Sequence, residues 1–138
     1  MLSAVSIELE RYDWTGRSVA YGYFDNYLLI QGNMFAPAVD LVPALCAALA
    51  TELPRPARTW VLYLIGEIVS ADVHIEEPAQ ARIELPERAK EHARAALWLF
   101  YHELCHGRAD LAYDILEEIE PDRDRLARFE ERARDQRR

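Results

Sequence analysis

One five-residue segment of this 138-residue chain has the spacing of a zinc-binding motif. In His102-Glu103-Leu104-Cys105-His106 the two histidines are four residues apart, so on a helix they project from one face and could share a Zn²⁺ ion. Glu103, between them, could act as general base toward a zinc-bound water. The segment therefore raises the hypothesis of a zinc-dependent hydrolase with His102 and His106 as ligands and Glu103 as the catalytic group.

Other features of the same segment favour a purely structural role. Gly107 follows the second histidine directly and is expected to close the helix in a left-handed conformation. His106 would then lie in the last helical turn, where it interacts favourably with the helix dipole. A third ligand would have to come from residues that stand in no recognised pattern, namely Asp110, Asp114, Glu117 or Glu118. The hydrolase is thus the alternative hypothesis, and the leading expectation is a protein without a cofactor.

A second group of residues suggests binding rather than catalysis. Tyr63 and Glu67 fall on the non-core side of a predicted helix, and an acidic stretch with Asp72, Glu76 and Glu77 follows. The whole chain has 16 Lys and Arg against 24 Asp and Glu, a formal net charge of −8. This balance favours a basic protein as partner and disfavours nucleic acid and anionic membranes. The simpler alternative is a solvated helix face with an acidic loop.

Composition and length indicate one globular domain spanning residues 1–138. Hydrophobic residues make up 51% of the chain, enough for a single core at this length. Residues 1–14 lack the basic start and apolar run of a secretory signal, and no apolar run is long enough for a membrane span, so we expect a cytoplasmic protein. Cys46 and Cys105 are expected to be buried thiols. The oligomeric state is left open.

Apolar residues spaced three and four apart predict six helices. They span residues 19–32, a segment that starts at Asn33 or Asp40 and continues through Leu49, and residues 57–70, 86–106, 110–120 and 122–138. The alternation of Val5, Ile7 and Leu9 would allow a short strand, and residues 72–85 are expected to form a long acidic connection with room for one helical turn. Residues 122–138 are expected to form a charged helix that caps the end of the stack.

The third predicted helix has the clearest amphipathic pattern. Its core positions are expected to be Val61, Leu64, Ile65 and Ile68. Its remaining faces would carry Thr59, Tyr63, Glu67 and Ser70.

Two neighbouring segments resemble a HEAT-type repeat. Residues 36–45 read APAVDLVPAL, with a proline near the start and a leucine ladder, and residues 58–68 read RTWVLYLIGEI, opening with Arg and containing a Leu-x-x-Ile pattern. Residues 31–37, QGNMFAP, resemble the lead-in of small bacterial HEAT-like proteins. The resemblance implies an all-α fold, a short α-solenoid of about three antiparallel helix pairs, with an irregular helical bundle as the alternative.

The same resemblance implies a function. Some small bacterial HEAT-like proteins act as interaction modules or as immunity proteins of toxin systems. In such a stack the second helix of each pair lines the concave side, which would place Tyr63 and Glu67 in the groove. The partner would then be another protein, a cationic toxin domain such as a nuclease.

Overall fold

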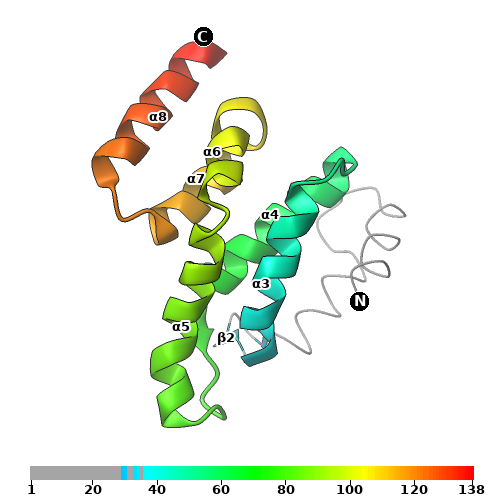
Figure 1. Ribbon diagram of the computed structural model, residues 1–138, viewed down its shortest axis with the longest axis vertical. Coiled ribbons are helices and arrows are strands. Elements are labelled where there is room, and N and C mark those ends of the chain that lie inside the picture. Colours follow the sequence, from blue (N-terminus) through cyan, green and yellow to red (C-terminus); the bar gives the residue numbers. More distant parts are fainter. Residues whose placement is uncertain (1–28, 31–32, 35) are drawn as a thin grey trace.

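Helices make up most of the described chain (Figure 1). The computed structural model describes residues 29–30, 33–34 and 36–138. Within these residues the helices are α3 (Ala36–Leu49), α4 (Arg55–Ser70), α5 (Ala79–Arg94), α6 (Leu97–His106), α7 (Ala109–Ile119) and α8 (Arg123–Arg137). The predicted all-α class is confirmed. In the same described ranges, no helix combines the length and the apolar character needed to cross a bilayer.

Three strands of two residues each lie beside the first helix pair, two before α3 and one after α4. β1 (Leu29–Ile30) pairs antiparallel with β2 (Asn33–Met34), and β2 pairs parallel with β3 (Asp72–Val73). The predicted helix over residues 19–32 is therefore wrong at Leu29–Ile30, because these residues use their backbone groups for strand pairing. The rest of that helix, and the possible strand at Val5, Ile7 and Leu9, lie outside the described residues.

The helices α3 and α4 form a hairpin joined by residues 50–54. α3 begins at Ala36, so neither Asn33 nor Asp40 is its cap, but the start is close to the earlier alternative and Pro43 lies inside the helix on its exposed side, as that alternative implied. The Ala36 backbone N–H donates to Glu77 Oε1 at 2.9 Å, which satisfies one of the open donors of the first turn. α4 covers the predicted helix 57–70 and starts two residues earlier, with Pro56 in its first turn, where a missing N–H costs nothing.

The predicted connection and fourth helix are wrong in their boundaries. α5 starts at Ala79, within the expected loop 72–85, and Pro86 is an interior residue of α5 rather than a first position. The first turns of α5 are mostly exposed, so they show little apolar periodicity. A break at Ala95 and Ala96 then separates α5 from α6, although alanine favours helix at both positions.

The last three helices follow with short turns. Gly107 ends α6 as predicted, but its φ is −131°, so it does not adopt the left-handed conformation. α7 begins at Ala109, and Asp110 lies inside its first turn instead of capping it. Asp122 caps α8 as predicted, its side chain accepting from the Arg125 N–H at 2.9 Å.

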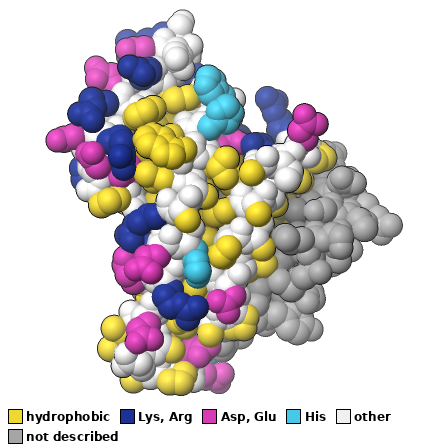
Figure 2. Space-filling model, in the orientation of Figure 1, with side chains coloured by type: hydrophobic (Ala, Val, Ile, Leu, Met, Phe, Trp, Pro, Cys, Tyr) yellow, Lys and Arg dark blue, Asp and Glu magenta, His cyan; other side chains and the backbone are white. Residues whose placement is uncertain are grey.

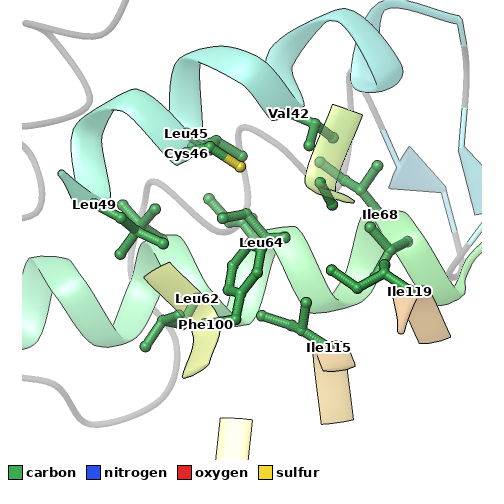
Figure 3. Packing of buried hydrophobic residues seen from close by; sticks show 14 of the residues in the cluster. Val42, Leu45, Cys46, Leu49, Leu62, Leu64, Ile68, Phe100, Ile115 and Ile119 are labelled. Carbon is green, nitrogen blue, oxygen red and sulfur yellow. The ribbon is translucent and has the colours of Figure 1, made fainter. Parts of the chain in front are cut away.

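Packing between the helices brings two hairpins together. α3 packs on α4 and α5, α4 packs on α7, α6 packs on α7, and α8 packs mainly on α6. Figure 3 shows Leu45 and Cys46 of α3 directed toward α4, with Phe100 of α6 and Ile115 of α7 completing the core below. The predicted core positions of α4 are all buried, but Thr59 is buried as well, only 6% exposed.

The two cysteines differ in their surroundings. Cys46 is buried in the core, and this burial raises the pKa of its thiol to about 11. Cys105 is only half-buried, so the expectation of two buried thiols holds for Cys46 alone.

A buried carboxylate fixes α8 to the preceding helices. Glu120 is 1% exposed and accepts from Arg125 Nε and Nη2 at 2.8 Å, from the Tyr101 hydroxyl at 2.6 Å and from the Asp122 N–H at 2.9 Å. The Arg125 guanidinium, with help from the Tyr101 hydroxyl, holds the pKa of Glu120 down at about 2. The Tyr101 ring also packs at a tilt against Phe129 of α8, with ring centroids 4.5 Å apart. The last helix is thus fixed by one buried ionic group and an aromatic contact.

Candidate functional site

A hollow of about 320 Å³ lies between α4 and α7. We call it the acidic hollow. Its polar lining includes Glu67 from α4 and Asp114, Glu117 and Glu118 from α7. Its apolar lining comes from Leu62, Tyr63 and Leu111. Tyr63 and Glu67, the two residues that the sequence placed on one non-core face, are half-buried and line the same hollow.

The charge of the acidic hollow is only partly balanced. Glu118 Oε2 lies 3.5 Å from Lys90 Nζ of α5. Among the described residues, no cationic group forms an ion pair with Glu67, Asp114 or Glu117. Uncompensated carboxylates that share a hollow of this size repel one another, and a cation that enters the hollow relieves that repulsion.

The other predicted acidic residues are not part of the acidic hollow. Asp72 lies in β3, opposite Asn33. Glu76 is exposed in the turn before α5, and its N–H donates to His74 Nδ1 at 3.1 Å. Glu77 caps α3 through its bond to the Ala36 N–H. Asp72 and Glu77 therefore lie near the start of α3, and Glu77 already has a structural role there.

A second and larger hollow of about 560 Å³ contains the zinc-like segment. We call it the basic hollow, because Arg55, Arg58 and Arg108 line it together with His102 and His106. It lies where α4 begins, α6 ends and α7 begins. The two imidazole rings are exposed, with centroids 4.9 Å apart. As the motif predicted, both histidines project from one face of a helix.

The position of Glu103 differs from that of a general base. It is 3% exposed and forms an ion pair with Arg58 Nε. Nη2 of the same guanidinium donates to the Leu49 carbonyl at 3.0 Å. Glu103 Oε2 also lies 3.4 Å from the Arg108 N–H and fills the space beside Gly107. A carboxylate held this way connects the ends of α3, α4 and α6. It is buried while the two imidazoles are exposed, and both of its oxygens already accept hydrogen bonds, so the hydrolase hypothesis gains no support from this geometry.

No group of three or more His, Cys, Asp or Glu side chains in the described parts of the chain is arranged to hold one metal ion. The proposed third ligands from α7 are accordingly elsewhere: Asp110 pairs with Arg108, while Asp114, Glu117 and Glu118 line the acidic hollow.

The two hollows lie along one helix–helix contact. Arg55, at the start of α4, and Arg108, just before α7, both line the basic hollow, whereas Glu67 and Glu117, near the ends of these helices, both line the acidic hollow. α4 and α7 therefore run in the same direction. Each helix carries partial positive charge at its start and partial negative charge at its end, so the helix dipoles reinforce the charge of both hollows.

Most of the lining of the acidic hollow was not among the sequence candidates. From the sequence, Asp114, Glu117 and Glu118 are candidates only as zinc ligands. One local signal existed, because Asp114, Glu117 and Glu118 follow one another at helical spacing after Leu111. The contact that brings this face beside Glu67 joins residues about fifty positions apart.

Comparison of the chain with protein families, curated proteins and solved structures finds no match to any of them.

Figure 2 shows how charge is distributed over one face of the molecule: Lys and Arg side chains alternate with Asp and Glu, and hydrophobic side chains are exposed among them. Trp98 of α6 is 60% exposed, with the Arg125 guanidinium 5.3 Å from its ring centroid.

Proposed function

We propose that this protein is a protein-binding module whose acidic hollow takes up a basic segment of a partner protein. The observation that carries the proposal is the set of three carboxylates, Glu67, Asp114 and Glu117, without an ion-pair partner among the described residues, beside the half-buried Tyr63. Arginine fits such a lining, because its guanidinium pairs with carboxylates and stacks on aromatic rings.

The arrangement of the helices supports a HEAT-like solenoid as the framework of this module. α4 and α7 are the second members of two hairpins and lie side by side in the same direction, as equivalent helices of stacked repeats do. The hollow between them is then the concave groove in which such proteins bind. An immunity protein that neutralises a cationic toxin domain, such as a nuclease, is one form of this function, and the net charge of −8 supports it through faster association.

The test compares two triple variants that remove the same charge. The hollow variant is Glu67→Gln, Asp114→Asn and Glu117→Gln. The control variant neutralises three exposed acidic residues outside the acidic hollow, Glu52→Gln, Glu91→Gln and Glu131→Gln. Because both variants change the net charge from −8 to −5, a difference between them reports the hollow and not overall charge.

Each chain is used to capture proteins from a lysate of the source cells, and the captured partner is then titrated at several salt concentrations. We expect the hollow variant to lose about tenfold or more in affinity, with a smaller salt dependence, while the control variant binds like wild type. Equal loss in both variants, or a captured partner without an excess of Lys and Arg at its contact surface, would contradict the proposal.

A further inference from the structure

The basic hollow is a cationic depression in an acidic protein. Three arginines line it, and Glu103 is the only carboxylate among the described residues of its lining. Glu103 is neutralised by its ion pair with Arg58. Arg108 pairs with Asp110 through Nε at 3.1 Å and Nη2 at 2.9 Å. Arg55 forms no ion pair with any residue that the structure describes. The lining thus keeps an excess of positive charge after the internal pairs are counted.

Two helix starts add to this positive charge. α4 has 16 residues and α7 has 11, and both begin at the basic hollow. The residues preceding them, Pro54 and Arg108, make no side-chain hydrogen bond to the first-turn N–H groups. At α7 the Ala109 N–H already donates to the Gly107 carbonyl at 3.0 Å and the Asp110 carboxylate occupies the first turn, so a bound anion interacts mainly with the N–H groups and the dipole at the start of α4.

The lining of the basic hollow also includes a buried hydroxyl. Thr59 is 6% exposed and lines the basic hollow, and its side chain makes no hydrogen bond to any described residue. Burying a hydroxyl without a partner is energetically unfavourable, so in folded proteins such groups generally face a ligand or a water. Thr59 therefore points to a ligand by an observation independent of the charges.

We propose that the basic hollow binds a small organic phosphate. Arg55 and the imidazoles of His102 and His106 lie at its open side as hydrogen-bond donors, and Thr59 supplies a hydroxyl from the buried side. The volume of about 560 Å³ is that of a small-molecule site and exceeds the needs of an inorganic ion, so the ligand carries an organic group as well as the phosphate. This site is separate from the acidic hollow and does not depend on the function proposed there.

The experiment titrates the full chain with ribose 5-phosphate, with ribose and with inorganic phosphate, following backbone amide shifts by NMR. We expect saturable shifts at the start of α4 and at Arg108 with ribose 5-phosphate, weaker binding of inorganic phosphate and none of ribose. Arg55→Gln should weaken ribose 5-phosphate about tenfold or more, because it removes a charge-assisted hydrogen bond. Arg128→Gln, an exposed arginine of α8, is the matched control and should bind like wild type.

Thr59→Val separates ligand binding from stability. Valine has nearly the same shape and removes a hydroxyl that has no hydrogen-bond partner among the described residues. The melting temperature without ligand should therefore stay the same or rise, while binding of ribose 5-phosphate weakens several-fold. Binding that is unchanged in Arg55→Gln and Thr59→Val, or equal for ribose and ribose 5-phosphate, would overturn the proposal. Saturable Zn²⁺ binding that His102→Ala abolishes, without any phosphate binding, would also overturn it and return the segment to the metal hypothesis.

Discussion

Replacing the buried Glu120 by glutamine measures how strongly one carboxylate holds α8 in place. In the folded chain this carboxylate accepts hydrogen bonds from Arg125 and from the Tyr101 hydroxyl, and its pKa falls from 4.5 to about 2. Since one pKa unit corresponds to about 1.4 kcal/mol, the folded state favours the ionised form by about 3 kcal/mol.

The direction of this pKa change sets the sign of the pH dependence. Because the folded-state pKa of Glu120 lies below the unfolded value, its contribution to stability is fully present above about pH 4.5 and is lost as the pH falls toward about 2. Urea unfolding of wild type and Glu120→Gln, followed by tryptophan fluorescence, gives the free energy of unfolding at each pH. We expect the advantage of wild type to shrink by about 3 kcal/mol between about pH 7 and about pH 2.

A matched substitution controls for the general effect of acid. Glu91→Gln removes one exposed carboxylate from α5, so its stability difference from wild type should stay near zero at every pH. A difference between wild type and Glu120→Gln that is constant from about pH 7 to about pH 2 would refute the reasoning, because glutamine cannot titrate and only the carboxylate can produce a slope.

Three further predictions concern groups near the two hollows and in the core. Gly107→Ala should destabilise the fold by about 2 kcal/mol in urea unfolding, because the added Cβ would lie 2.0 Å from Glu103 Oε2; a stability equal to wild type would contradict this. Glu77→Ala should lower the free energy of unfolding by about 1 kcal/mol through loss of the cap on α3, and Glu77→Gln, which keeps an acceptor oxygen, should lose less. Burial raises the pKa of the Cys46 thiol to about 11, so Cys46 should react with a disulfide reagent only after unfolding, whereas the half-buried Cys105 should react first. Equal reaction rates of the two thiols in the native protein would contradict the burial of Cys46.

The predictable part of the fold is the part with local signals. α4 was found within two residues of its start, because an apolar stripe and the flanking prolines Pro54 and Pro56 mark it in the sequence. α8 was found because Asp122 follows Pro121 and caps the next helix. In both cases the residues that determine the element lie inside it or next to it.

The missed elements depend on contacts that are distant in sequence. The early turns of α5 carry exposed residues such as Ile83 and Glu84, so they lack the stripe that marks a buried helix. The strand at Leu29–Ile30 exists because β2 pairs with it, and β2 in turn pairs with β3 about forty residues later. Apolar spacing along one segment cannot report such pairing.

The candidate site residues also fall into those that local sequence signals reveal and those that depend on contacts between distant segments. Tyr63 and Glu67 were found because they lie on one face of a recognisable helix. The acidic residues opposite them on α7 were assigned to a different hypothesis, since the sequence does not show which helix lies beside α4. Glu103 was read as a possible base, whereas its pairing with Arg58 depends on two segments 45 residues apart.

Because α4 and α7 run in the same direction, the basic hollow and the acidic hollow lie at opposite ends of the same pair of helices. Arg55 and Glu67 are twelve residues apart on one helix, which at 1.5 Å per residue is a separation of about 18 Å. The Debye length at physiological ionic strength is about 8 Å, so a charge arriving at one end is largely screened at the other. A cation bound in the acidic hollow and an anion bound in the basic hollow would therefore have little effect on each other's affinity at physiological ionic strength. The two binding events would influence each other only in dilute buffer.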